Sequence, residues 1–414
     1  MKTSKYVILG GGMVAGYCAK ELVERGLKPG ELTILSSDTS LPYERPPLSK
    51  GFLKGQDSEE GIRINPEEFY REHAIEVRLG SAAARVDPSR KTVHLQSGDE
   101  ILFDKLVIAT GSRVRTLGVP GSNRPGIYYL RSLEDSKRIR ERAASAKRAV
   151  VIGGSFIAME VASVLAQKGV ETTMVLREDR IWKQFFTPAM SRFFESYYAA
   201  RGLRFEKQAH IAALHGKSEL ESVALADRRS IACDFLVAGI GVRPVIEPVA
   251  NTRIELGDGV IVNEYLETSV PGIYAAGDVA SYRDALFEKR RRVEHWDNAV
   301  AQGQHCAALL TGERTRFVHV PYFFSDGFDL SYELWGDPAE AGEVVERGDL
   351  SSTSFSVWWL SQNRLVAAFT MNRAEEERDA APRWIAAKQP VSAETLRSAA
   401  SITQAGQAST LRAG

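Results

Sequence analysis

Residues 6–19 read Tyr-Val-Ile-Leu-Gly-Gly-Gly-Met-Val-Ala-Gly-Tyr-Cys-Ala, and this stretch decides the fold. The apolar run Tyr6–Leu9 is typical of a buried parallel strand. Gly10, Gly12 and Ala15 then match the spacing of a glycine-rich turn that leads from a strand into a helix. In such a turn the first glycine allows the tight bend, the second lets the backbone approach a pyrophosphate, and the small third residue lets helix and strand pack closely. The N-terminus of the helix adds free N–H groups for the phosphates.

A single glycine-rich turn is a weak signal, because ordinary strand-to-helix turns also contain glycine. In this chain a second apolar run, Leu32–Leu35, predicts the next strand. Asp38 follows that strand at the point where an acid would bind ribose hydroxyls. The stretch and its continuation therefore predict a site for an adenine dinucleotide.

The composition excludes several classes of protein. The chain has 414 residues, which suggests two or three domains. Lysine plus arginine and aspartate plus glutamate number 53 each, so no net charge favours nucleic acid or an anionic membrane as a partner. No apolar run approaches the length of a membrane span, and the first strand begins too early to leave room for a signal peptide. We expect a cytoplasmic protein, monomeric or homodimeric, that binds neither nucleic acid nor membrane.

The three cysteines, Cys18, Cys233 and Cys306, are few, odd in number and far apart. This pattern argues for a reducing compartment and against a disulfide framework or a metal cluster. No metal site is expected.

The opening pattern recurs later in the chain. Residues 149–160 read Ala-Val-Val-Ile-Gly-Gly-Ser-Phe-Ile-Ala-Met-Glu, again an apolar strand, a glycine-rich turn and the start of a helix. Thr172–Leu176 predicts the second strand of this repeat, and Glu178 follows it. Phe235–Gly241 closes the second repeat as residues 105–110 close the first. Two such halves indicate dinucleotide binding far more strongly than one, because two chance matches in one chain are improbable.

Smaller elements accompany the repeats. Short strands over residues 81–103 predict a small antiparallel set, with its last strand at 101–103 separate from the strand at 105–110. Residues 219–225 supply a similar strand in the second repeat. A helix is expected to open at residue 293 and to run through residue 310.

Two further segments each allow a structural and a functional interpretation. The proline-rich loop of residues 41–50 carries Arg45 and Lys50; it is either a solvated surface loop or a stiffened support that holds a cation over a ligand. The apolar run from Val270 ends at Gly277 and Asp278. That aspartate either caps the end of a strand or places an acid beside the first glycine turn.

From about residue 317 the composition changes. Aromatic residues crowd a segment of short strands, which includes a hairpin about residues 361–364, and this predicts a third, smaller domain. Residues 391–414 are expected to form a short helix and a loose tail.

Together these motifs resemble the FAD-dependent pyridine nucleotide reductases, in the branch that holds monodehydroascorbate reductases, ferredoxin and rubredoxin reductases and apoptosis-inducing-factor-like proteins. The resemblance covers about residues 5–380. Its most specific pieces are the turn at residues 10–16, Tyr43–Lys50, Phe156–Glu160, Gly239–Pro244, Gly277–Asp278 and Glu294–Trp296. It implies an α/β fold with two Rossmann-like dinucleotide-binding domains, of the three-layer ββα type seen in glutathione reductase, and a smaller α+β C-terminal domain.

The resemblance also implies domain boundaries. An FAD-binding domain would comprise residues 1–112 and 243–316, and an NAD(P)-binding domain would comprise residues 113–242. The C-terminal α+β domain would take residues 317–390, followed by the helix and tail.

By the same resemblance, each half contributes a set of cofactor-binding residues. FAD would be bound by Gly10, Gly12, Ala15, Asp38, Arg45, Lys50, Ala83, Arg131, Asp278 and the backbone of Trp296. NADH, or else NADPH, would be bound by Gly153, Ser155, Phe156, Ile157, Glu160, Glu178 and Gly241. Glu178 favours NADH because its carboxylate would bind ribose hydroxyls and repel a 2′-phosphate, while the neighbouring Arg177 favours NADPH.

Lys50 and Glu160 match a catalytic pair that lies between flavin and nicotinamide in this family. Lys50 would stabilise negative charge on the flavin, and Glu160 would orient the nicotinamide amide and restrain Lys50. The alternative for Glu160 is an exposed carboxylate on a helix surface. A nicotinamide stacked on the flavin can then transfer a hydride, with the protein supplying placement and electrostatics.

The sequence departs from the family pattern at several positions. No Cys-x-x-Cys follows the first strand–helix unit, which argues against the disulfide-reductase branch. Ser155 and Ala158 occupy positions where glycines are usual. Val300 and Phe324 stand where, by our matching, monodehydroascorbate reductases place an arginine and a tyrosine against the ascorbate radical.

Three functions remain open at this point. The first is a reductase that delivers electrons to a ferredoxin-type iron–sulfur protein. The second is a reductase of a small molecule, such as monodehydroascorbate or a quinone. The third is a redox-sensing protein of the apoptosis-inducing-factor type. For the first, residues 283 and 289–292 form a basic run that suits an acidic ferredoxin, although it also fits a solvated charged loop.

Overall fold

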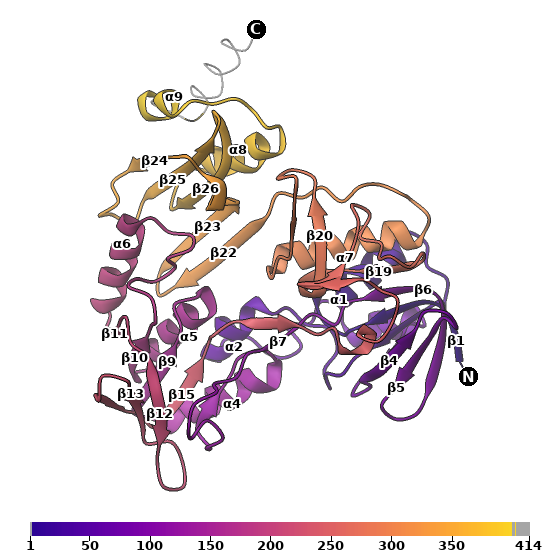
Figure 1. The fold of residues 1–414 in the computed structure, drawn as a ribbon, viewed down its shortest axis with the longest axis horizontal. Coiled ribbons are helices and arrows are strands. Elements are labelled where there is room, and N and C mark those ends of the chain that lie inside the picture. Colours follow the sequence, from indigo (N-terminus) through magenta and orange to yellow (C-terminus); the bar gives the residue numbers. More distant parts are fainter. Residues whose placement is uncertain (1, 400–401, 403–414) are drawn as a thin grey trace. The chain divides into compact units, whose positions relative to one another are not determined.

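The computed structural model describes residues 2–399 and residue 402, and the chain divides into two compact units (Figure 1). The first unit comprises Met1–Pro47, Asp57–Arg113 and Val242–His319. The second comprises Leu48–Gln56, Val114–Gly241 and Val320–Gly414. The segment that carries Lys50 thus groups with the second unit, whereas the boundaries expected from sequence place it in the first. Those domain boundaries remain a prediction.

The first unit is built on a sheet whose central strands are parallel. Its elements are β1 (Lys2–Leu9), α1 (Met13–Glu24), β2 (Leu32–Leu35), α3 (Glu67–Glu72), β3 (Glu76–Arg78), β4 (Ala83–Asp87), β5 (Thr92–Leu95), β6 (Glu100–Ile108), β16 (Val242–Pro244), β17 (Leu256–Gly257), β18 (Gly259–Ile261), β19 (Ile273–Ala275), β20 (Ala280–Asp284), β21 (Lys289–Arg291) and α7 (Trp296–Leu310). β3, β2, β1 and β6 are neighbours in that order and run parallel. The other edge of β6 pairs with antiparallel β5 near its start and with parallel β19 near its end.

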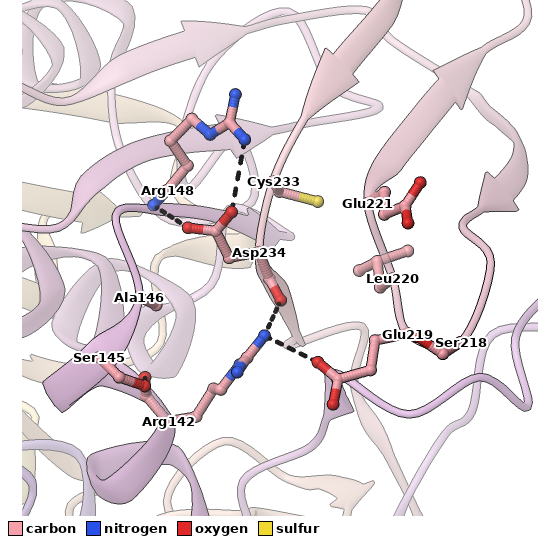
Figure 2. A pocket seen from close by; sticks show the side chains of 10 residues that line it. All are labelled: Arg142, Ser145, Ala146, Arg148, Ser218, Glu219, Leu220, Glu221, Cys233 and Asp234. Carbon is pink, nitrogen blue, oxygen red and sulfur yellow. Dashed lines mark hydrogen bonds and ion pairs between the residues drawn. The ribbon is translucent and has the colours of Figure 1, made fainter.

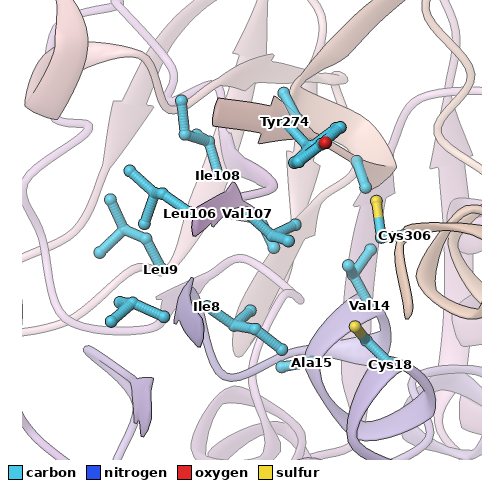
Figure 3. Close-up of a cluster of buried hydrophobic side chains, with 14 of the residues drawn as sticks. Ile8, Leu9, Val14, Ala15, Cys18, Leu106, Val107, Ile108, Tyr274 and Cys306 are labelled. Atoms are coloured by element: carbon cyan, nitrogen blue, oxygen red, sulfur yellow. The ribbon is translucent and has the colours of Figure 1, made fainter. Parts of the chain in front are cut away.

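The core of this unit explains why the opening stretch folds as predicted. Every residue of β2 and the last four residues of β1 are buried, as expected for strands covered on both faces. Helices α1 and α7 pack so closely that a Cβ on Gly303 would lie only 2.9 Å from the carbonyl oxygen of Val14. Figure 3 shows the side chains that gather here from β1, β6, β19, α1 and α7, among them Ile8, Leu9, Val14, Ala15, Cys18, Leu106, Val107, Ile108, Tyr274 and Cys306.

The second unit repeats the parallel arrangement and adds an antiparallel sheet. Its elements are α2 (Gly51–Lys54), β8 (Ile127–Tyr128), α4 (Leu133–Ser145), β9 (Arg148–Ile152), α5 (Phe156–Gln167), β10 (Glu171–Val175), α6 (Pro188–Ala199), β11 (Arg204–Glu206), β12 (Ile211–His215), β13 (Ser222–Leu225), β14 (Ser230–Ala232), β15 (Phe235–Ala238), β22 (Tyr322–Gly327), β23 (Leu330–Gly336), β24 (Glu343–Gly348), β25 (Phe355–Ser361), β26 (Arg364–Met371), α8 (Glu375–Ala386) and α9 (Ala393–Ser398). Strand β7 (Ser112–Val114) spans the boundary between the units. The parallel sheet has the order β11-β10-β9-β15-β8, and β12-β13-β14 form a separate meander.

The C-terminal sheet has the antiparallel order β22-β23-β26-β25-β24. It shares one apolar core with the parallel half of the unit: Phe186 and Phe194 near α6 contact Phe369 of β26, with ring centroids 5.3 and 6.3 Å apart. This common core gives a physical reason for the grouping of residues 320–414 with residues 114–241 in one compact unit.

The architecture confirms the predicted fold class, and several element boundaries differ from the predictions. Residues 101–103 and 105–108 belong to one continuous strand, β6, because β1 pairs along nearly all of it. The helix expected from residue 293 begins at Trp296, and the strand expected from residue 219 begins at Ser222. The hairpin about residues 361–364 is confirmed. Of the expected C-terminal helix and tail, α9 is confirmed, and nearly all of the tail lies outside the described residues.

Candidate functional site

The first glycine turn has the geometry that a dinucleotide requires. Gly10 has φ +130°, and a Cβ there would lie 2.1 Å from the carbonyl oxygen of Ala109, so only glycine fits. Gly12 is the N-cap of α1 and makes no side-chain cap. A Cβ on Gly12 would lie 3.7 Å from a guanidinium nitrogen of Arg45, which places that cation beside the turn, as predicted. The uncapped N–H groups and the arginine together fit a pyrophosphate.

Two predicted acids lie near carboxyl ends of parallel strands in the first unit. Asp38, after β2, accepts hydrogen bonds from the Tyr43 hydroxyl at 2.9 Å and the Ser40 backbone N–H at 3.1 Å. Asp278, after β19, accepts one from the Ser112 hydroxyl at 2.6 Å. Ligands of open α/β sheets bind outside this edge, so both positions suit the predicted roles.

The structure adds two residues, Glu44 and Tyr17, to which the sequence analysis gave no role. Glu44 accepts a hydrogen bond from the Tyr17 hydroxyl and another from the indole N–H of Trp296, each at 2.5 Å. The Glu44 carboxylate therefore fixes the side chain of Trp296, for which only a backbone role was predicted. Glu44 lies within the Tyr43–Lys50 motif, which could have drawn attention to it. Its partners Tyr17 and Trp296, however, lie 27 and 252 residues away in the sequence. Ala83, another predicted flavin contact, begins β4.

The second glycine turn repeats the first in the second unit. Gly153 has φ +114°, and a Cβ there would lie 2.3 Å from the carbonyl oxygen of Gly239. Ser155 is the N-cap of α5, yet its hydroxyl caps no backbone N–H. By contrast, Ser132 and Thr187 cap α4 and α6 with their hydroxyls. The N-terminus of α5 thus keeps its donors for another acceptor, which fits a nucleotide phosphate.

The remaining residues predicted for the nicotinamide nucleotide occupy the same half. Phe156 packs on Phe323 and Trp182, with ring centroids 3.4 and 4.0 Å apart, while Ile157 is 45% exposed. Gly241 has φ +92° and accepts a hydrogen bond from the backbone N–H of Arg115 at 2.9 Å. The exposed Ile157 is an apolar side chain that a ligand could cover.

Glu178 and Arg177 follow β10 as predicted. Their charged atoms are 3.9 Å apart, and their side chains are 42% and 76% exposed, respectively. Such an exposed pair contributes little to stability, so both groups are available to a nucleotide ribose.

Lys50 and Glu160 are close together, as predicted, but Lys50 has a nearer partner. The Lys50 ammonium lies 3.4 Å from a Glu160 oxygen and 2.8 Å from an oxygen of Asp326, in β22. Glu160 is buried, which excludes the exposed alternative, and its two oxygens accept hydrogen bonds from the hydroxyls of Ser49 and Ser325 at 2.5 Å each. Asp326, rather than Glu160, therefore holds Lys50 most closely. Ser49, Ser325 and Asp326 were all missed by the sequence analysis.

Burial raises the pKa of the Glu160 carboxyl, and Lys50 and the two serine hydroxyls partly oppose this rise. The ring of Phe324 lies 4.3 Å from the Lys50 nitrogen, a cation–π distance. Lys50 is thus surrounded by two carboxyl groups and one aromatic face.

Arg131 was predicted to contact the flavin. It precedes α4, and its backbone N–H donates to Asp135 at 3.1 Å. Like Lys50, it belongs to the second unit, so its contact with a flavin remains a prediction.

A pocket of about 330 Å³ in the second unit contains none of the predicted site residues (Figure 2). Its polar groups bind one another: Arg142 donates to Glu219 at 3.0 Å and to the carbonyl oxygen of Asp234 at 2.8 Å. The Asp234 carboxylate also accepts the backbone N–H of Arg148. These groups tie α4, β9 and β15 together, and we assign the pocket no ligand.

The basic run at residues 283 and 289–292 is partly structural. Arg291 pairs with the buried Asp284 at 3.1 Å, and its side chain is only 11% exposed. Arg292 is 10% exposed and pairs with Glu294 and Asp258. Arg290 donates to two backbone carbonyl oxygens. Arg291 and Arg292 are therefore mostly covered, whereas Arg283 and Arg290 remain exposed. That this run meets an acidic ferredoxin stays a prediction.

The cysteines Cys18, Cys233 and Cys306 are all buried and free. Within the described chain, no helix is both long and apolar enough to cross a membrane, and no three metal-binding side chains gather into a site.

Comparisons with known proteins agree with this geometry. A family model described as pyridine nucleotide-disulphide oxidoreductase matches residues 4–303, and one described as reductase C-terminal matches residues 322–404. Among curated relatives, a monodehydroascorbate reductase of Solanum lycopersicum is 33% identical over 95% of this chain and 97% of its own length. One from Pisum sativum is 34% identical over 94% and 95%.

Two solved structures match over nearly their whole length. The chain is 27% identical to a chain of the covalent putidaredoxin reductase–putidaredoxin complex, with a TM-score of 0.94 and full coverage of both chains. It is 31% identical to a ferredoxin reductase of Rhodopseudomonas palustris, with a TM-score of 0.92 and 99% of both chains covered.

Proposed function

The chain belongs to the pyridine nucleotide-disulphide oxidoreductase family, and on that premise we propose that it transfers electrons from NADH to a ferredoxin-type iron–sulfur protein. It is an oxidoreductase that uses FAD and a nicotinamide nucleotide, as the sequence predicted. Bound FAD supplies a hydride acceptor that can release electrons one at a time. The three cysteines are buried and free.

The residues of each unit bind one cofactor in this proposal. In the first unit, the turn at Gly10 and Gly12 with Arg45 holds the flavin pyrophosphate, and Asp38 binds the ribose. In the second unit, the N-terminus of α5 at Ser155 binds the nicotinamide nucleotide, and Glu178 binds its adenosine ribose in preference to a 2′-phosphate.

Lys50 and Glu160 act at the nicotinamide in the proposed mechanism. The Lys50 ammonium supplies a fixed positive charge beside the reacting rings, and Glu160 orients the nicotinamide amide. The buried hydrogen bonds from Ser49 and Ser325 keep the Glu160 side chain in one position.

One observation favours a protein acceptor over monodehydroascorbate. At position 324 we expect monodehydroascorbate reductases to carry a tyrosine, whose hydroxyl can bind the radical. This chain has Phe324 there, and the centroid of its ring lies 4.3 Å from the Lys50 nitrogen. A small anionic radical needs charge-assisted hydrogen bonds worth roughly 1.5–3 kcal/mol each, and a phenyl ring offers none. A protein acceptor needs only an accessible flavin edge and a rim that steers encounter.

The test compares two acceptors under one set of conditions. We expect NADH-dependent reduction of cytochrome c through an added ferredoxin to be faster than reduction of monodehydroascorbate, and to slow as salt rises. Rapid turnover of monodehydroascorbate with no ferredoxin activity would contradict the proposal.

The second candidate is reduction of a small molecule. It is favoured by the identity of 33–34% that the chain shares with monodehydroascorbate reductases over nearly its whole length. The same two-acceptor assay distinguishes the candidates. A cytoplasmic location is also proposed, on the basis of the unpaired cysteines.

A further inference from the structure

Lys50 lies between two carboxyl groups that differ in their surroundings. Glu160 has a side-chain exposure of 5%, and a serine hydroxyl donates to each of its oxygens. Asp326 has a side-chain exposure of 44% and gives Lys50 its shortest ion pair, 2.8 Å. Asp326 is therefore the carboxylate that faces solvent, and Glu160 is the one that faces the interior.

The charges of these three groups do not leave a cationic site. Burial favours the neutral form of Glu160. When Glu160 is neutral, only Asp326 opposes the positive charge of Lys50; when Glu160 is ionised, both carboxylates do. In neither state does the group carry a net positive charge while Asp326 is ionised. Phe324 covers another side of the ammonium with an apolar ring.

We propose that Asp326 is a specificity-determining residue: its carboxylate cancels the positive charge of Lys50 towards solvent and so disfavours small anionic electron acceptors. This inference rests on the proposed function, in which Lys50 lies beside the flavin. The physical basis is electrostatic, because a charge at the mouth of a site changes the local concentration of an approaching ion and hence its reaction rate. A neutral acceptor is not subject to this effect.

The first test uses Asp326→Asn, which removes the charge and keeps the shape. The assay would follow the oxidation of NADH with one of two electron acceptors: ferricyanide, which is a trianion, or benzoquinone, which is neutral. One NADH gives two electrons and releases one proton when it reduces two ferricyanide ions; with one benzoquinone, a proton is taken from solvent instead. We expect kcat/KM for ferricyanide to rise about five- to tenfold at low ionic strength, and the rise to shrink as salt increases. For benzoquinone we expect less than about a twofold change.

Asp329→Asn is the matched control. Asp329 lies three residues further along the chain and loses the same charge, but it pairs with Arg201 at 3.3 Å rather than with Lys50. We expect it to leave the ratio of the two acceptor rates unchanged. An equal rise for both acceptors in Asp326→Asn, or an equal effect in the control, would overturn the inference.

A second readout needs no turnover. Lys50 can be labelled with trinitrobenzenesulfonate, an anionic amine reagent, or with the N-hydroxysuccinimide ester of acetic acid, a neutral one, and the modified peptide quantified by mass spectrometry. The ratio of the two labelling rates should rise several-fold in Asp326→Asn, and Asp326→Glu should restore the low ratio. An unchanged ratio would overturn the inference.

The two levels of the proposal fail differently. A protein that reduces both small acceptors with the expected Asp326 dependence, but never reduces a ferredoxin, would retain this inference and lose the proposed protein acceptor. A protein that reduces ferredoxin without any Asp326 dependence would do the reverse.

Discussion

The two glycine turns share one backbone design and differ in the side chains around it. In both, a glycine with positive φ lies so close to a carbonyl of the closing strand that no Cβ fits, at 2.1 Å for Gly10 and 2.3 Å for Gly153. In the first, Asp38, the acid proposed to bind ribose, already accepts hydrogen bonds from Tyr43 and Ser40. In the second, the Glu178 side chain is 42% exposed, and its nearest charged partner, Arg177, is 3.9 Å away.

This difference teaches which nucleotide each turn suits. A preorganised site loses little entropy when it binds, which favours tight and lasting association. The turn at Gly10 therefore suits a resident FAD. The turn at Gly153, whose acid has only a 3.9 Å ion pair to hold it, suits a nucleotide that must leave after each turnover.

The largest effects are expected from substitutions that disrupt one glycine turn and leave the other intact. Gly10→Val should abolish flavin binding, because both the positive φ and the carbonyl contact exclude a side chain. Gly153→Val should leave the protein yellow and reduce the rate of flavin reduction by NADH at least about a hundredfold, for the same steric reason. Flavin content and stopped-flow reduction measure the two outcomes. Normal flavin content in Gly10→Val would refute the assignment of the first turn.

Corresponding positions on the two helices offer a second test. Tyr17 of α1 and Glu160 of α5 each lie seven residues after the first glycine of their turn. Tyr17 donates a hydrogen bond to Glu44, and Glu160 accepts one from Ser49. Glu160→Gln should slow hydride transfer about tenfold, because an amide cannot reproduce the carboxylate. Tyr17→Phe should leave that rate unchanged and instead speed flavin release. Equal effects of both variants on hydride transfer would show that the two positions are not functionally distinct.

Glu160 also gives the stability of the protein a pH dependence with a definite sign. Burial raises its pKa above the usual 4.5, so the folded state binds this proton more tightly than the unfolded chain. The free energy of unfolding contributed by Glu160 is therefore full below a pH of about 4.5 and is lost as pH rises through the folded-state pKa. The Tm of Glu160→Gln relative to wild type should increase across this window. Glu141→Gln, at an exposed carboxylate, is the control variant, and a falling difference for Glu160→Gln would contradict the sign.

Nucleotide preference tests Glu178, the acid of the second turn. Glu178→Ala should lower the ratio of kcat/KM for NADH to that for NADPH by about tenfold, because the carboxylate no longer repels a 2′-phosphate. Arg177→Ala should raise the same ratio. An unchanged ratio in Glu178→Ala would mean that the ribose is recognised elsewhere.

The smallest effect is expected at Ser155, which replaces the glycine found at position 12 of the first turn. Ser155→Ala should raise KM for NADH by about two- to tenfold, the value of one hydrogen bond to phosphate, with kcat unchanged. Ser155→Gly should behave similarly. No change in KM would show that the hydroxyl does not contact the nucleotide.

The sequence predicted the features that depend on local rules. Gly10, Gly153 and the buried strands beside them follow from backbone conformation and hydrophobic pattern, which a short stretch specifies. Ser325 and Asp326 could not be found in this way, because Asp326 contacts Lys50 across 276 residues and only the packing of β22 brings them together.

The basic run shows the same limit. The arginines near residue 290 suggest a solvated surface, but antiparallel pairing of β20 with β21 sets Arg291 beside Asp284 and turns the cation inward. Charge in the sequence does not reveal such pairing. Glu44 was missed for a similar reason, since Trp296, which donates to it, is 252 residues away.

The most direct test of the two-turn account is an anaerobic titration of the purified protein with NADH, followed by flavin absorbance. The account predicts a yellow protein with about one FAD per chain, whose absorbance is bleached completely by about one equivalent of NADH. A colourless protein that cannot be reconstituted with FAD, or a yellow one that neither NADH nor NADPH reduces, would contradict it.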